Sequence, residues 1–205
     1  MHPYPVAFGV DYAERRSRLS AFFRLILAIP LMLWLYVFSI VGYLAVAIAW
    51  FAIVITGRYP TGLYNLVARF TRFLACTNAY MGMLCDPYPS FVGSHDPSYP
   101  VRMHFVPLDR YSRLKTFFRA ILSIPILILR YAVNLLFEIA AVAAWFVILI
   151  TGRLPRGLFD VMVLANSYTA RSDAYLVLLT ETYPPFQDEQ TRAAGVESLP
   201  GAGAW

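Results

Sequence analysis

The sequence predicts an all-α integral membrane protein made of two tandem helical hairpins, about four membrane-embedded helices, with a short extended segment at the start of each repeat. Three observations favour this class: a long uncharged stretch, an apolar composition and an internal repeat. Residues 25–55 contain no charged side chain, and 18 or more such residues are typical of a transmembrane helix. Hydrophobic residues make up 59% of the 205 residues, charged residues only 14%, and the mean hydropathy is +0.57. An average soluble domain is about half apolar and about one quarter charged.

The repeat divides the chain. A shift of 95 residues aligns residues 4–91 with residues 99–186 without a gap, and 34 of the 88 aligned positions are identical. The clearest pair is "AWFAIVITGRYPTGLYN" and "AWFVILITGRLPRGLFD". A gapless match of this length indicates a duplication. We therefore predict a first membrane repeat (1–91), a linker (92–98), a second membrane repeat (99–186) and a flexible C-terminal tail (187–205).

Each repeat begins with an alternating segment, "YPVAFGVDY" in the first and "YPVRMHFVP" in the second. Alternation of this kind is weakly typical of a strand. One arrangement open to the two segments is a small sheet at the membrane surface.

A long apolar run follows in each repeat, at residues 30–55 and 125–150. With a helical rise of about 1.5 Å per residue, each run extends for roughly 39 Å and can cross a hydrocarbon core of about 30 Å. Pro30 and Pro125 suit the first helical position, where the missing N–H has no helical partner. If the helices continue upstream instead, these prolines become kinks.

The return segments, residues 62–84 and 157–179, are amphipathic. In the first of them Asn65, Arg69 and Arg72 follow one helical stripe, and Cys76 extends it. The second is more polar still. Two topologies remain open, in which these segments either cross the bilayer or lie flat in its interface while each long apolar run folds back on itself.

The arginines favour the crossing topology. They concentrate before the apolar runs and are sparse at the opposite turns, so the positive-inside rule places both termini in the cytoplasm. Copies that align without a gap and share the same arginines should also sit in the membrane the same way round. We expect four spans in two parallel hairpins, related by a pseudo-twofold axis along the membrane normal.

The turns between helices carry the most similar residues of the two copies. A glycine is expected to end the preceding helix in a left-handed cap, and a proline to stand at or near the restart. The arginine between them is expected to reach lipid head groups or to cap helix carbonyls. These structural residues are Gly57, Arg58, Pro60, Gly152, Arg153 and Pro155.

No catalytic, cofactor or metal motif is present, so we predict neither an enzyme nor a cofactor. The three histidines have no ligand spacing. Cys76 and Cys85 are expected to be free thiols, with a disulfide as the alternative. The net charge of +5 is better explained by arginines that meet anionic lipid head groups than by nucleic-acid binding.

Polar residues within the apolar segments are the candidate functional positions, because charge at membrane depth is costly. Arg130, Asn134 and Glu138 recur at i, i+4 and i+8, on one face of an unbroken helix. Residues of the return segments are available as partners. This set can form a polar seam between helices, a contact for lipid or a partner subunit, or a transport pathway. The return-segment members are Arg69, Arg72, Arg171 and Asp173.

The motifs "YPV…SRL…FFRLILAIP", "WFAIVITGRYPTGL" and "AYLVLLTETYPPF" resemble a bacterial membrane protein family, domain of unknown function 4389, over residues 4–186 in two tandem copies. The resemblance implies the bacterial cytoplasmic membrane and supplies no catalytic residue. The second copy departs from the first with "FVPLDRY" for "VDYAERR" and with its three added polar residues.

We expect a non-enzymatic accessory or scaffold subunit that packs laterally in a larger membrane complex or against itself. The alternative is an oligomeric channel or transporter for a small solute, ion or lipid, based on Arg130 and Glu138. A third hypothesis is a lipid-binding organiser that uses the basic stretches 15–24 and 110–119.

Overall fold

The computed structural model describes residues 4–93, 96 and 98–185. The predicted C-terminal tail, His2 and His95 lie outside the described residues. The elements in chain order are β1 (Val6–Val10), α1 (Arg18–Thr56), α2 (Thr61–Met81), β2 (Val101–Phe105), α3 (Arg113–Phe117), α4 (Arg119–Leu122), α5 (Ile124–Thr151) and α6 (Arg156–Leu176).

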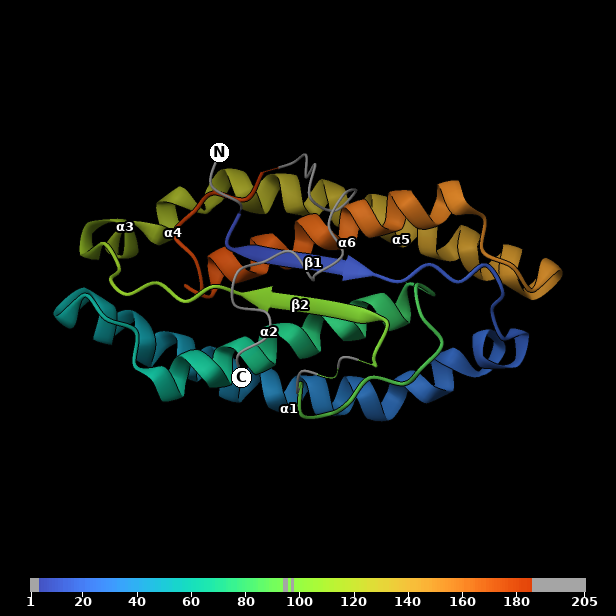
Figure 1. Ribbon diagram of the computed structural model, residues 1–205, viewed down its shortest axis with the longest axis horizontal. Helices are drawn as coiled ribbons and strands as arrows, with labels where there is room; N and C mark the ends of the chain where they lie inside the picture. The colour runs from blue at the N-terminus through green and yellow to red at the C-terminus, as the bar shows by residue number, and fades with distance from the viewer. Residues whose placement is uncertain (1–3, 94–95, 97, 186–205) are drawn as a thin grey trace.

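The two helical hairpins expected from the repeat are present as α1–α2 and α5–α6 (Figure 1). In α1 the helix continues upstream of the apolar run to Arg18, with Pro30 inside it. The second run, residues 125–150, likewise lies within the unbroken helix α5, so the alternative in which the runs fold back on themselves is wrong for both repeats. The second repeat differs only upstream of its apolar run, where the helix is interrupted at Phe118 and Ser123, so that Pro125 lies in the first turn of α5 as the sequence allowed.

Local sequence explains where the helices begin and end. The Ser17 and Ser112 side chains accept hydrogen bonds from backbone N–H groups three residues ahead, as N-cap residues do. The predicted left-handed caps are confirmed, because Gly57 and Gly152 have φ angles of 73° and 72°. Each restart proline, Pro60 and Pro155, is the N-cap residue of the next helix.

The two strands pair in an antiparallel ribbon, hereafter the β1–β2 ribbon, which confirms the sheet considered from the sequence. Phe8 lies opposite Met103, and these two residues are equivalent under the 95-residue shift. Val6 pairs with Phe105, and Val10 pairs with Val101. Under the 95-residue shift Val6 is equivalent to Val101 and Val10 to Phe105, so exchanging the two repeats leaves these pairs unchanged. A pseudo-twofold axis therefore passes through the ribbon at the Phe8–Met103 pair.

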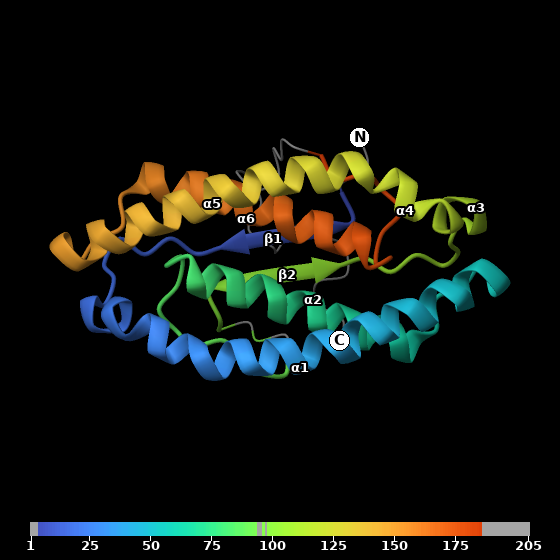
Figure 2. The ribbon, with the colours of Figure 1, turned by 180° about the vertical axis from the view of Figure 1, so that it is seen from behind.

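This axis makes the hairpins antiparallel. The backbone N–H of Arg16, before α1, donates to the Gly152 carbonyl at the end of α5, at 3.0 Å. At the opposite end, the N–H of Tyr111 donates to the Gly57 carbonyl at 2.9 Å. Figures 1 and 2 show α1 and α5 running in opposite directions. The parallel hairpins expected from the sequence are wrong, because antiparallel strand pairing reverses everything that follows each strand.

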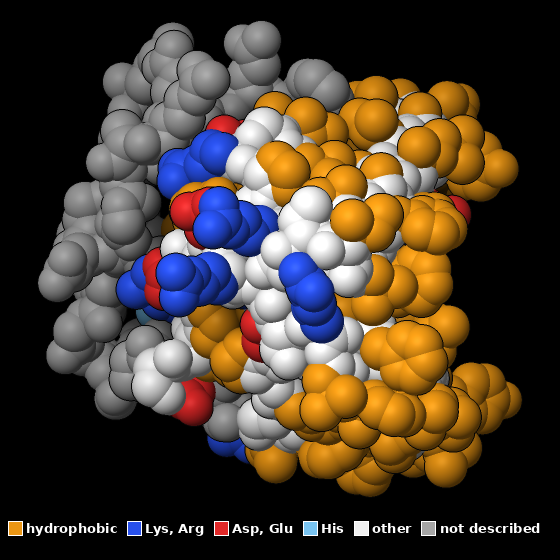
Figure 3. Space-filling model, turned by 90° about the vertical axis from the view of Figure 1, so that its right-hand side faces the viewer, with side chains coloured by type: hydrophobic (Ala, Val, Ile, Leu, Met, Phe, Trp, Pro, Cys, Tyr) orange, Lys and Arg blue, Asp and Glu red, His pale blue; other side chains and the backbone are white. Residues whose placement is uncertain are grey.

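The molecule has three layers. The β1–β2 ribbon covers α2 and α6, and α1 and α5 lie on the side away from the ribbon (Figures 1 and 2). The core lies between these layers and includes Phe8, Phe73 and Met162. By contrast, α1 and α5 expose large apolar side chains, among them Ile29 at 66% and Ile128 at 69%. In Figure 3 the hydrophobic side chains gather on the face opposite the charged side.

Candidate functional site

A polar seam joins α5 to α6 within the second hairpin. Arg130 Nη2 lies 2.7 Å from Asp173 Oδ1, and both side chains are largely buried. The Thr169 hydroxyl donates to Asn134 Oδ1 at 3.0 Å. The seam thus combines one ion pair and one hydrogen bond on adjacent helical turns. Such pairs fix the register of two helices, because a mismatch leaves a buried charge unpaired.

Glu138, the third polar residue predicted on this face, does not join the seam. Its side chain is exposed on α5 and forms no ion pair with a described residue. Large exposed apolar side chains surround it in the sequence, namely Leu135, Ile139 and Val142. The structure therefore places a carboxyl group on an otherwise apolar surface.

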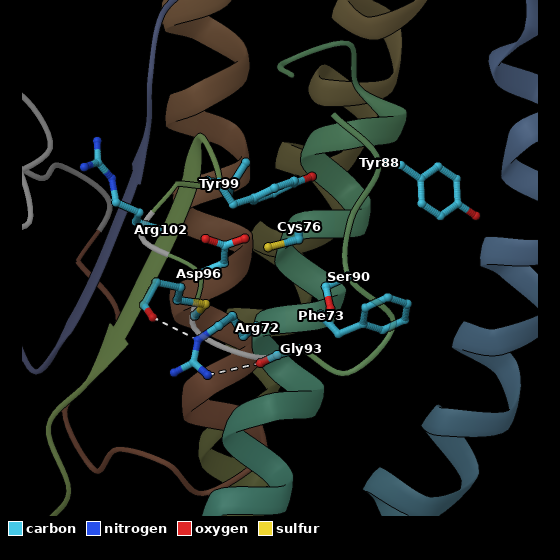
Figure 4. Close-up of a pocket in the computed structure, with 11 residues that line it drawn as sticks. Arg72, Phe73, Cys76, Tyr88, Ser90, Gly93, Asp96, Tyr99 and Arg102 are labelled. Carbon is cyan, nitrogen blue, oxygen red and sulfur yellow. Dashed lines mark hydrogen bonds between the residues drawn. The ribbon is translucent and has the colours of Figure 1, made fainter. Parts of the chain in front are cut away.

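The arginines of the return helices also lie away from the seam. Arg69 is exposed on α2. Arg72 donates through Nε to the Met103 carbonyl and through Nη1 to the Gly93 carbonyl, each at 3.2 Å (Figure 4). Arg171 is buried and bonds to the Ser167 carbonyl and hydroxyl. These bonds attach α2 to the ribbon and its loop, and they stabilise α6 internally.

A cavity of about 120 Å³ lies between α2, the ribbon and the loop that follows α2 (Figure 4). Arg72, Cys76 and Tyr99 are among its lining residues. Cys76 and Cys85 are both free, as expected. Burial raises the pKa of the Cys85 thiol, and its Sγ lies 3.4 Å from the Tyr99 hydroxyl. A neutral thiol at ordinary pH is a poor nucleophile.

Metal-ligating side chains are scattered. Among the described residues, no group of three or more His, Cys, Asp or Glu side chains could hold a metal ion.

Two buried arginines form clasps that sequence reasoning missed. Arg24 donates to the carbonyls of Tyr80 and Cys85, its guanidinium lies 4.3 Å from the Tyr80 ring centroid, and it pairs with Asp86 at 3.2 Å. The guanidinium therefore joins α1 to the end of α2, where the Tyr80 carbonyl also accepts from the Met83 N–H at 3.1 Å, and to the segment after α2 that holds the Cys85 carbonyl.

The second repeat contains the equivalent clasp. Arg119 donates to the Thr180 carbonyl at 3.0 Å and lies 4.0 Å from the Tyr175 ring centroid. The acidic residues of the two clasps, Asp86 and Glu181, also accept from the N-cap N–H groups of Ser17 and Ser112. The repeat held a signal for this, because the arginine, the tyrosine and the acidic residue recur at a spacing of 95 residues.

The arginines of residues 15–24, which include the start of α1, are thus of two kinds, buried and exposed. Arg24 is 1% exposed, and Arg16 is buried and donates to the Leu84 carbonyl at 2.6 Å. Burial lowers the pKa of Arg16, which remains cationic at neutral pH. Arg15 and Arg18 are exposed. Only the exposed pair is available to an external ligand.

The turn arginines differ between the two ends. Arg58 is exposed, and its backbone N–H is bonded to the Thr56 hydroxyl. Arg153 makes the same backbone bond to Thr151 and also lies 3.5 Å from Glu14. Neither turn arginine donates a side-chain hydrogen bond to a helix carbonyl among the described residues.

Two segments, Arg18–Thr56 and Arg119–Thr151, are long and apolar enough to cross a membrane. No curated protein and no solved structure matches the chain. One family, described as "Domain of unknown function (DUF4389)", matches residues 18–93 and again residues 113–187. The first match contains the α1–α2 hairpin with its clasp residues, and the second contains α3 to α6 with the equivalent clasp. The chain therefore belongs to the DUF4389 family and carries two tandem copies of its domain.

Proposed function

We propose that this protein is a non-enzymatic membrane subunit that packs laterally against other membrane proteins of the bacterial cytoplasmic membrane. The observation that carries the proposal is Glu138, an exposed carboxyl group within the apolar surface of α5. A charge facing lipid is costly, and intramembrane ionisable groups pair with one another or face a protein interior. A partner helix with a Lys or Arg at the same depth would remove this cost.

The apolar surface supports a membrane location. In each of the two long apolar segments only 22% of the most hydrophobic stretch is buried. The central helix of a soluble protein would be mostly covered by other elements. Here the uncovered side chains gather on one face and on its flanks (Figure 3). An apolar surface this broad is unusual for a soluble monomer and suits the acyl chains of a bilayer.

The pseudo-twofold axis supports an in-plane orientation of the helices. An axis along the membrane normal places both repeats the same way round, with α1 and α5 lying parallel to the bilayer. The ribbon, with the exposed Arg102–Asp11 pair, then faces water. If the helices instead crossed the bilayer, the open edges of the ribbon would lie at membrane depth, where unpaired backbone groups are not tolerated. In this orientation the arginines at both ends face the cytoplasmic side.

The in-plane orientation is tested by one-sided labelling. Single cysteines at Thr61 and Ser17, in a background without Cys76 and Cys85, are treated with a membrane-impermeant maleimide in inside-out and right-side-out vesicles. Both positions are exposed. The in-plane arrangement predicts that both label from the cytoplasmic side. The four-span topology predicts opposite sides, and that result would reject the in-plane proposal.

The lateral contact is tested on native gels of membranes that contain the tagged protein. The wild type is expected to migrate with a larger assembly, and Glu138→Lys to release it, because two cations would then face each other. The matched control is Tyr43→Gln, at the equivalent position of α1, which should leave the assembly intact. Migration of the wild type as a monomer would argue against the proposal, as would a Glu138→Lys variant that assembles normally.

The channel alternative has weaker support, because Arg130 is engaged by Asp173 at 2.7 Å. It remains testable by flux into proteoliposomes. Flux that disappears when Arg130 and Glu138 are replaced by apolar residues would favour it over the subunit.

A further inference from the structure

Two open pockets lie at opposite ends of the molecule and are related by the pseudo-twofold axis. The first, of about 490 Å³, is formed by the α1–α2 turn and the approach to α3. The second, of about 570 Å³, is formed by the α5–α6 turn and the approach to α1. Each pocket therefore needs residues from both repeats and exists only because the hairpins are antiparallel.

The first pocket gathers three cations. Its lining is Thr56, Gly57, Arg58, Arg110, Tyr111 and Arg113. All three arginines are exposed, and none forms an ion pair with a described acidic residue. The hydrogen bond from the Tyr111 N–H to the Gly57 carbonyl, 2.9 Å long, holds the two walls together.

The acidic residues near this pocket do not neutralise it. Glu181 is held by the Ser112 backbone N–H, which donates to its Oε1 at 2.5 Å. Asp109 is exposed, does not line the pocket and makes no ion pair with a described residue. The pocket is thus cationic, and its ligand donors are the three arginines, because the Thr56 hydroxyl already donates to the Ala52 carbonyl at 2.6 Å.

The second pocket is lined by two arginines, and each has an acidic partner. Arg18, the counterpart of Arg113, lies beside Gly152 at this end but does not line the pocket. Arg153 lies 3.5 Å from Glu14, and Arg156 lies 3.3 Å from Asp160. Arg156 also lies 4.5 Å from the centroid of the Tyr12 ring. Figure 3 looks onto this end and shows acidic side chains beside the basic ones. Glu14 is the counterpart of Asp109, and Asp109 forms no ion pair with Arg58, the counterpart of Arg153.

We propose that the first pocket binds the phosphate of an anionic phospholipid head group, with Arg58 and Arg113 as its main ligands. Guanidinium groups bind phosphate oxygens through paired, charge-assisted hydrogen bonds. A lipid fits better than a free anion, because Ile55 and Leu114, the residues next to Thr56 and Arg113, are 70% and 69% exposed. The inference rests on the proposed membrane location but not on a partner complex.

The proposal is tested by native mass spectrometry of the full chain in detergent, titrated separately with phosphatidylglycerol, phosphatidylcholine and inorganic phosphate. One phosphatidylglycerol is expected to bind tightly, and Arg58→Gln/Arg113→Gln should weaken this binding by about tenfold or more, since each lost charged hydrogen bond costs about a factor of ten. The matched control, Arg153→Gln/Arg18→Gln at the equivalent positions, should change the affinity by less than about threefold.

A gain of binding provides a second test that does not depend on the stability of the double variant. Glu14→Gln releases Arg153 in the second pocket and should add a second bound phosphatidylglycerol. Equal losses in the two double variants, or an unchanged count with Glu14→Gln, would overturn the assignment to the first pocket. Equally tight binding of inorganic phosphate or phosphatidylcholine would overturn the assignment to an anionic lipid. Extraction of the wild type from membranes by alkaline carbonate would contradict the proposed membrane location, whatever the result of the lipid titrations.

Discussion

Phe8 lies directly opposite Met103 in the β1–β2 ladder, and the two residues hold the same position in their repeats. A ladder centred on equivalent residues imposes twofold symmetry on whatever the strands carry. The two hairpins therefore run in opposite directions, and the turn of each one meets the approach of the other. The end pockets and the division between apolar and polar faces both follow from this pairing.

The glycine caps should be required for folding. Gly57→Val and Gly152→Val each place a β-branched residue at a φ angle above 70°, which should lower the free energy of unfolding by about 1–2 kcal/mol or more. Thermal unfolding in detergent measures the effect. Gly62→Val is the control, because a Cβ there meets nothing within 4 Å, and it should change stability by less than about 0.5 kcal/mol. Wild-type stability of both cap variants would contradict the assigned role.

The Arg24 clasp should contribute strongly to the first hairpin. Arg24→Met removes the guanidinium donor from the buried Cys85 carbonyl and one of two donors from the Tyr80 carbonyl, and we expect a loss of about 1–3 kcal/mol in the free energy of unfolding. The loss stays within this range because Asp86 is 31% exposed and is solvated by water. Urea unfolding followed by tryptophan fluorescence measures it. Arg18→Met, at an exposed arginine of the same helix, should leave the free energy of unfolding nearly unchanged. An equal loss in this variant would contradict a specific stabilising role of the Arg24 contacts.

Gly82 should be required where the two repeats meet. A Cβ at this position would overlap the ring of Phe137 on α5. Gly82→Ala should therefore lower the free energy of unfolding by about 1–3 kcal/mol. Adding Phe137→Leu should recover part of the loss, whereas Gly157→Ala, in open space, should have little effect. A Gly82→Ala protein as stable as the wild type would show that the ring moves aside without cost.

The Arg130–Asp173 pair should behave as a coupled unit. Arg130→Met alone leaves a carboxylate that is 9% exposed without its cation, which should cost about 3–5 kcal/mol. Adding Asp173→Leu should restore most of the stability, because an apolar pair can replace a buried ion pair. A double-mutant cycle of unfolding free energies measures the coupling. Additive losses would mean that the two side chains act independently.

Cys85 should react slowly with alkylating agents. Burial raises its pKa, so the thiolate fraction at pH 8 is smaller than for an ordinary cysteine, and reactivity should rise only at higher pH. Mass spectrometry after timed treatment with iodoacetamide measures the rate, with the denatured protein as control. Rapid labelling of the folded chain would contradict the buried position.

Local features of the fold were predictable from the sequence. The 95-residue repeat predicted two hairpins, the Thr-Gly-Arg segments predicted left-handed caps, and alternation predicted the strands. Each depends on residues close in sequence, where glycine, proline and apolar spacing have direct conformational consequences.

The relative direction of the hairpins was not predictable in the same way. It depends on strand pairing between residues about 95 positions apart. The alternating pattern only weakly predicted the two strands, and it did not predict their direction or register. The premise that both copies sit the same way round does not fix this direction. A twofold axis along the membrane normal makes the hairpins parallel if their helices cross the bilayer and antiparallel if the helices lie in its plane.

The candidate site was predictable in part for a similar reason. Helical spacing placed Arg130 and Asn134 on one face, and both do meet α6. Nothing local distinguished them from Glu138, which is exposed, or distinguished the buried Arg24 from the exposed Arg18. Burial of an arginine is decided by which carbonyls the tertiary fold leaves unsatisfied nearby.

The symmetric ladder also has a consequence for a chain that carries one copy of the repeat. Contact between equivalent residues, Phe8 with its counterpart, is what an isologous interface between two identical subunits requires. Two separate single-repeat chains would form this interface only above some protein concentration. Joining the copies through one linker makes the same interface intramolecular, so its formation no longer depends on the protein concentration. It also frees the two ends to diverge, as Asp109 and Glu14 have done.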